Sequence, residues 1–194
     1  IDKLSFDLKA KGNGFDLFDK STTYYVHLSL DTMRYAGTSL GSIALDASQE
    51  NGVSTIIATG NDPNLVFSLY ADNGLDSTGI KNITRLDVRK ADFGNLDLVN
   101  GDLSSELQLA LEFGSDLNEI HSLKFSVEKI KLETAQRIFT PENIYVDIAT
   151  APDSTHVIAK NGDLNINGAM ESGYNRLFRS LERTGEIFNE SMKQ

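Results

Sequence analysis

The sequence predicts an all-β protein whose strands are mostly antiparallel. Apolar and polar residues alternate with a period of two in run after run, as in Leu4–Lys9 and Val26–Asp31. Successive side chains of a strand point to opposite faces of a sheet, so each run has one apolar and one polar face. Buried parallel strands would instead read as continuous apolar segments. Asn-Gly pairs, which favour tight turns, lie beside several of the runs.

The alternating runs follow one another along the chain and amount to about eleven or twelve strands. They include Leu4–Lys9, Val26–Asp31, Ile43–Ser48, Val53–Gly60, Leu65–Tyr70, Leu107–Phe113, Leu123–Val127, Ile144–Ala149 and Asp163–Asn167. Asn and Gly tolerate the positive φ that tight hairpins require. The pairs that predict such turns are Asn51-Gly52, Asn73-Gly74, Asn100-Gly101 and Asn161-Gly162.

One run changes its alternation. Leu123, Phe125 and Val127 share a parity, whereas Ile130 and Leu132 have the opposite one. A β-bulge near Glu128-Lys129 would return the second pair to the apolar face, because a bulge inserts one extra residue into a strand. Two separate short strands would explain the same pattern.

The last part of the chain changes to a helical spacing of apolar residues. Tyr174, Leu177, Phe178 and Leu181 are spaced as on one helical face, and Ser172 is a suitable N-cap. We therefore expect a β-sheet segment over residues 1–170 and an amphipathic helix over 171–194 that packs on the sheet or caps it. The chain begins without Met and without a signal peptide, and we interpret it as a segment of a longer protein.

Composition excludes several function classes. The net charge is −10, which argues against nucleic acid and anionic lipid surfaces as electrostatic partners. No apolar run approaches the length of a membrane span. There is no Cys, the three His residues stand apart, and no nucleotide-binding, hydrolase or zinc-protease motif occurs. We expect no catalytic residues, no metal site and no cofactor, and hence no enzyme.

The alternation alone does not determine how the apolar faces are covered. Two sheets can stack into a sealed sandwich, or one sheet can curl until its apolar face lines an open trough. The sandwich would suit an extracellular or periplasmic adhesion or carbohydrate-binding module. An open trough would suit a hydrophobic cargo, because soluble proteins seldom expose large apolar patches that have no use.

A resemblance favours the trough. The segment Tyr35–Ser48 continues through Val53–Gly60 and Asn64–Ala71, and this unit resembles one in TamB, the translocation and assembly module, and in its AsmA-like relatives. The stretch from Ile83 to Met170, which closes on Asp163–Met170 before the amphipathic segment, is similar to a recurring segment of that family.

The resemblance implies a strongly curved single sheet, shaped like a taco or half-barrel, within a periplasmic segment of an inner-membrane-anchored protein of a Gram-negative envelope. It implies an apolar groove that shields lipid acyl chains during transport between the membranes or during outer-membrane biogenesis and protein secretion. The implied protein partner is an Omp85-type outer-membrane barrel, reached through regions outside this sequence.

The predicted lining of this groove is the apolar parity of the strands. Each of its members could equally be an ordinary core residue. They are Leu28, Leu45, Phe67, Leu69, Leu109, Leu111, Phe125, Val146, Ile148 and Ile166.

Overall fold

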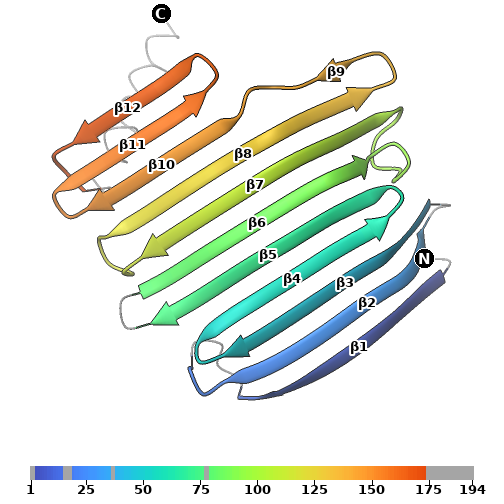
Figure 1. Cartoon of the computed structure of the whole chain (residues 1–194). Helices are drawn as coiled ribbons and strands as arrows, with labels where there is room; N and C mark the ends of the chain where they lie inside the picture. Colours follow the sequence, from blue (N-terminus) through green and yellow to red (C-terminus); the bar gives the residue numbers. More distant parts are fainter. Residues whose placement is uncertain (1–2, 15–18, 36–37, 77–78, 174–194) are drawn as a thin grey trace, which may run out of the picture.

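A computed structural model describes residues 3–14, 19–35, 38–76 and 79–173. These residues form one open, antiparallel sheet of twelve strands, and they contain no helix (Figure 1). The all-β, antiparallel, single-sheet prediction is confirmed. The helix expected over 171–194 lies, from residue 174 on, outside the described residues.

The strands follow one another as an up-and-down meander, so that sequence neighbours are also neighbours in space (Figure 1). Strand β9 is the exception, because it pairs only with the end of β8, and β10 then continues the sheet beside β8. The strands are β1 (Lys3–Asn13), β2 (Thr23–Tyr35), β3 (Thr38–Glu50), β4 (Val53–Asp62), β5 (Leu65–Asp76), β6 (Gly79–Asp92), β7 (Leu103–Ser115), β8 (His121–Thr134), β9 (Ile138–Phe139), β10 (Ile144–Ala151), β11 (Ser154–Asn161) and β12 (Leu164–Met170).

No second layer covers this sheet among the described residues. The only apolar side chains there that are buried are Ala58 and Ala91, and no large side chain is fully buried. The alternative of a sealed two-sheet sandwich is therefore wrong for the described part of the chain. The β1 edge even carries apolar side chains that are about half exposed, with Phe6 at 54% and Leu8 at 57%.

The turn predictions have a mixed outcome. Asn51-Gly52 joins β3 to β4 with positive φ at both residues (54° and 79°), as a tight hairpin requires. Asn73-Gly74 is not a turn, because β5 continues through it to Asp76 with pairing partners on β4 and on β6. Pairing on both sides outweighs the local turn preference of these two residues.

The predicted bulge is confirmed. Strand β8 is continuous, and its pairing with β7 shifts where the single residue Leu107 faces Lys129 and Ile130. Lys129 has a φ of 51°, a left-handed conformation for this extra residue. Beyond the bulge Leu132 pairs with Ser105, so the apolar residues of this half of β8 return to the same face as Val127.

Candidate functional site

The pairing register aligns the apolar parities of all strands into rows that cross the sheet. One row has a member on every strand of the main path, and only one of its members, Asn161, is polar. The row consists of Leu8, Leu28, Leu45, Ala58, Leu69, Leu86, Leu109, Val127, Ile144, Asn161 and Leu164.

A second row lies beside the first, two residues along each strand. It is apolar except for Thr84, and it consists of Ala10, Val26, Ala47, Ile56, Ala71, Thr84, Leu111, Phe125, Val146, Ala159 and Ile166. We call the face that bears these two rows the apolar face and the opposite one the polar face. Neighbouring strands are about 4.8 Å apart, so the rows run about 48 Å across the sheet.

All ten residues predicted to line a groove lie on the apolar face. Eight of them belong to the two rows, and the other two, Phe67 and Ile148, are two positions from Leu69 and Val146 on the same strands. The sheet therefore brings them to one surface, although they come from seven strands far apart in the sequence. Side chains in the middle of this face are half-buried, and Ile166 at the β12 edge is 49% exposed.

Phe67 also has a contact with the sheet itself. It pairs with Gly60 on β4, and a Cβ atom at Gly60 would lie 2.4 Å from the Phe67 ring. The ring thus covers the bare backbone of a strand glycine, an arrangement that stabilises strand pairing. Phe67 is therefore part of the packing of this face as well as of its exposed surface.

The sequence reasoning missed a polar border on the apolar face. Tyr24, Gln49, Ser54, Asn73 and Asn82 form the next row across β2–β6. They bond to one another: the Tyr24 hydroxyl donates to Ser54 Oγ (3.3 Å), Ser54 Oγ donates to Gln49 Oε1 (2.9 Å), and the Asn82 amide donates to Asn73.

On β7–β11 the same row remains apolar, with Phe113, Leu123, Ile148 and Val157. The apolar surface therefore ends earlier on one half of the sheet than on the other. The available sequence signal was the occurrence of Gln49, Asn73 and Asn82 at the apolar parity, where a strand would otherwise place a hydrophobic residue.

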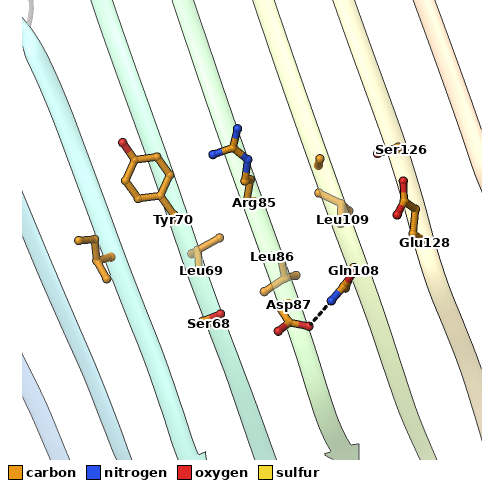
Figure 2. A pocket seen from close by; sticks show the side chains of 12 residues that line it. Ser68, Leu69, Tyr70, Arg85, Leu86, Asp87, Gln108, Leu109, Ser126 and Glu128 are labelled. Carbon is orange, nitrogen blue, oxygen red and sulfur yellow. Dashed lines mark hydrogen bonds between the residues drawn. The ribbon is translucent and has the colours of Figure 1, made fainter.

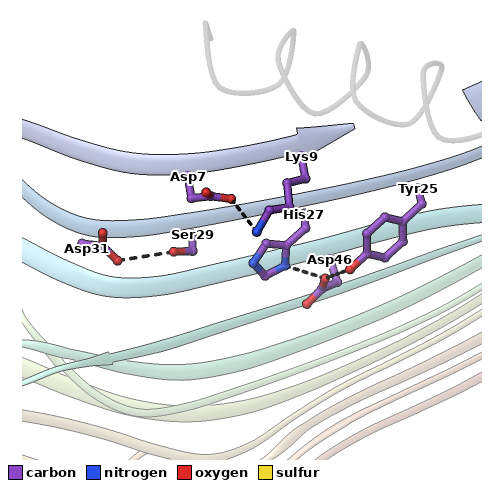
Figure 3. Close-up of polar contacts among 7 residues, drawn as sticks. All are labelled: Asp7, Lys9, Tyr25, His27, Ser29, Asp31 and Asp46. Carbon is purple, nitrogen blue, oxygen red and sulfur yellow. Dashed lines mark hydrogen bonds and ion pairs between the residues drawn. The ribbon is translucent and has the colours of Figure 1, made fainter. Parts of the chain in front are cut away.

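The polar face carries the charged groups. Asp46 on β3 is bonded by two side chains of β2: His27 Nδ1 lies 2.8 Å and the Tyr25 hydroxyl 3.0 Å from Asp46 Oδ1 (Figure 3). Lys9 pairs with Asp7 nearby at 3.3 Å. The hydrogen bonds from His27 and then Tyr25 lower the pKa of Asp46 from its ordinary value, whereas the Asp46 carboxylate raises the pKa of Tyr25.

The Asp46 contacts predict a loss of stability in acid. A carboxylate whose pKa is lowered by folding stabilises the fold above its ordinary pKa, and the stabilisation disappears as the pH falls through the lowered value. We expect the melting temperature of the native chain to exceed that of the Asp46→Asn variant at about pH 6, and the difference to shrink towards about pH 3. Thermal denaturation of both proteins across this range measures it, and a difference that stays constant would contradict the assignment.

The described ranges contain no assembled metal site. Within them, no group of three or more His, Asp or Glu side chains is arranged to hold a metal ion. His27 is engaged with Asp46, and His121 Nδ1 lies 2.8 Å from Ser115 Oγ. No helix of the described part is long and apolar enough to cross a membrane.

The fold and the two faces together define a class of protein: an open, single-layer antiparallel β-sheet with one largely apolar and one polar side. No protein-family model, no curated protein and no solved structure matches the chain. The resemblance to the TamB/AsmA-like family consequently rests on the order of sequence features alone, and it enters below as a proposal.

Proposed function

We propose that this chain is a periplasmic segment of a TamB/AsmA-like protein, and that its apolar face shields lipid acyl chains during transport between the inner and outer membranes or during outer-membrane assembly. One observation carries the proposal: an apolar surface crosses the sheet from β1 to β12 without a covering layer among the described residues. In this proposal the sheet curls around the lipid into a trough, and the protein acts without catalytic residues.

The composition of the apolar face favours acyl chains over a protein partner. Both rows consist of aliphatic residues and Phe125, apart from Thr84 and Asn161, and neither contains Tyr, Met or Arg. Protein interfaces are enriched in these three residue types and in Phe, of which the two rows contain only Phe125. An aliphatic surface instead offers an acyl chain about 0.8 kcal/mol for each methylene that it removes from water, without directional contacts that would hold the chain in place.

The geometry is also compatible with movement along the surface. The rows offer similar side chains at each step of about 4.8 Å, so a bound chain meets no strongly preferred position. The polar row from Tyr24 to Asn82 borders this path on β2–β6, where lipid head groups could remain in contact with water. In this proposal the protein is anchored in the inner membrane and meets an Omp85-type barrel through regions outside the sequence.

Photo-crosslinking tests the proposal with an internal control. A benzophenone amino acid replaces Leu69 or Leu109 on the apolar face, or Ser68 or Ala110 on the polar face, one position away in each case. Each protein is mixed with vesicles of phosphatidylethanolamine and phosphatidylglycerol that contain radiolabelled phospholipid, and is irradiated. We expect label on the proteins substituted at 69 and 109 and little on those substituted at 68 and 110. Equal labelling of both faces, or crosslinks from position 69 into the chain itself, would contradict the proposal.

A further inference from the structure

A hollow on the polar face has the features of a second binding site. It lies over β4–β8, from Ile57 to Glu128, and has a volume of about 380 Å³ (Figure 2). One row of cross-strand neighbours in this hollow consists of Tyr70, Arg85, Ala110 and Ser126. Ser68 lies two residues before Tyr70 on β5, on the same face. The small side chains of Ser68, Ala110 and Ser126 leave the space that the larger ones border. The volume lies in the usual range of small-ligand sites.

Tyr70 offers an aromatic surface at this hollow. Tyr70 is 37% exposed. Figure 2 shows the face of its ring, beside the guanidinium group of Arg85. Nothing in the fold requires an aromatic residue here, because the polar face packs against no other layer in the described part of the chain. A ring in this position is available for stacking with a ligand.

The polar groups around the ring are largely uncommitted. Among the described residues, the side chains of Arg85 and Glu128 form no hydrogen bond or ion pair, whereas the Asp87 carboxylate accepts a 3.3 Å hydrogen bond from the Gln108 amide. The site thus combines the five donors of a guanidinium group with carboxylate and amide acceptors. Guanidinium, carboxylate and amide groups are planar and can each bond to two neighbouring hydroxyl groups, because a hydroxyl group both donates and accepts hydrogen bonds.

We propose that this hollow binds a neutral saccharide, with one sugar ring stacked on Tyr70 and its hydroxyl groups bonded to Arg85, Glu128 and Gln108. An anionic ligand is disfavoured, because Asp87 and Glu128 border the site and the chain carries a net charge of −10. A sugar ring combines an apolar C–H face with hydroxyl groups, and this suits a hollow that Ile57 and Tyr70 border together with polar side chains. Tyr70, Arg85, Gln108 and Glu128 lie on the opposite side of the sheet from the proposed lipid surface, and the strand residues between them, Leu69, Leu86 and Leu109, also border the hollow. The variants below therefore change only side chains of the polar face, so that the two proposals are tested separately.

Titration calorimetry of the full chain with maltohexaose, cellohexaose and N-acetylchitohexaose tests the proposal. We expect at least one of them to bind with a dissociation constant of about 1 mM or below. Tyr70→Ala and Arg85→Ala should each weaken that binding about tenfold, since each removes a stacking surface or charge-assisted hydrogen bonds. Tyr70→Phe keeps the ring and should retain most of the affinity.

Tyr25→Ala is the matched control, because Tyr25 is an exposed tyrosine (39%) on the same face of the sheet, on β2, two strands away from the hollow. It should leave saccharide binding unchanged. Circular dichroism at the temperature of the titration should show a native spectrum for all four variants. The proposal is overturned if none of the three saccharides binds below about 10 mM, or if Tyr25→Ala weakens binding as much as Tyr70→Ala does. Phospholipid crosslinking at Leu69 should be the same in every variant.

Discussion

Replacing both Leu69 and Leu109 with aspartate is expected to reduce phospholipid retention more than tenfold while the sheet remains folded. The two side chains belong to the first row of the apolar face, the one that runs from Leu8 to Leu164, and are separated only by Leu86. Two carboxylates there must lose their hydration when an acyl chain passes over them, and they replace apolar surface that the chain would otherwise bury. Because no second layer packs on these positions in the described residues, the aspartates can remain in water when no lipid is bound.

Ser68→Asp with Ala110→Asp is the matched control for charge. These positions are on the same strands, one residue away, and their side chains lie on the polar face. The phospholipid retained after mixing with vesicles is measured by mass spectrometry, and folding is measured by circular dichroism. If the Leu69/Leu109 variant unfolds while the control does not, the two leucines are core residues. If it folds and retains as much phospholipid as the native chain, the apolar face is not the lipid surface.

Gly79→Ala should destabilise the fold by about 2–4 kcal/mol, the largest single-residue effect that we expect. Gly79 begins β6 with a φ of 126°, a conformation that residues with a side chain rarely adopt. A Cβ atom at this position would also lie 1.8 Å from the Ser115 carbonyl oxygen on β7. The backbone of β6 must therefore move away from β7, which breaks the pairing at this end of the two strands, where Ile80 pairs with Ser115.

Gly168→Ala provides the comparison for Gly79→Ala. Gly168 is a strand glycine on β12, and no atom lies within 4 Å of the position that its Cβ would take. Its replacement should change the free energy of unfolding by less than about 1 kcal/mol, because the only effect is that alanine favours the extended backbone more than glycine does. Urea denaturation of the two variants and the native chain measures the difference. Similar midpoints for both variants would show that the β6–β7 contact at Gly79 is not fixed as described.

The sequence by itself determined the local features of this protein. Strand periodicity depends only on successive side chains, so the apolar parity of Leu28, Leu69 or Val146 could be assigned without knowledge of any partner strand. The change of parity near Lys129 was also visible, although the sequence left a bulge and two short strands as alternatives and the continuity of β8 decided for the bulge. The hairpin at Asn51-Gly52 followed from the positive φ that these two residues tolerate.

The tertiary structure decided everything that depends on contacts between distant residues. Asn73-Gly74 has the composition of a turn, but pairing with β4 and β6 keeps it extended. The single layer, the alignment of parities into rows and the polar border from Tyr24 to Asn82 depend on which strands pair and in what register. The hollow between Tyr70 and Glu128 joins residues of β5 and β8 that are far apart in sequence. A period of two assigns each side chain to a face, but only long-range pairing determines its neighbours there and whether another layer covers them.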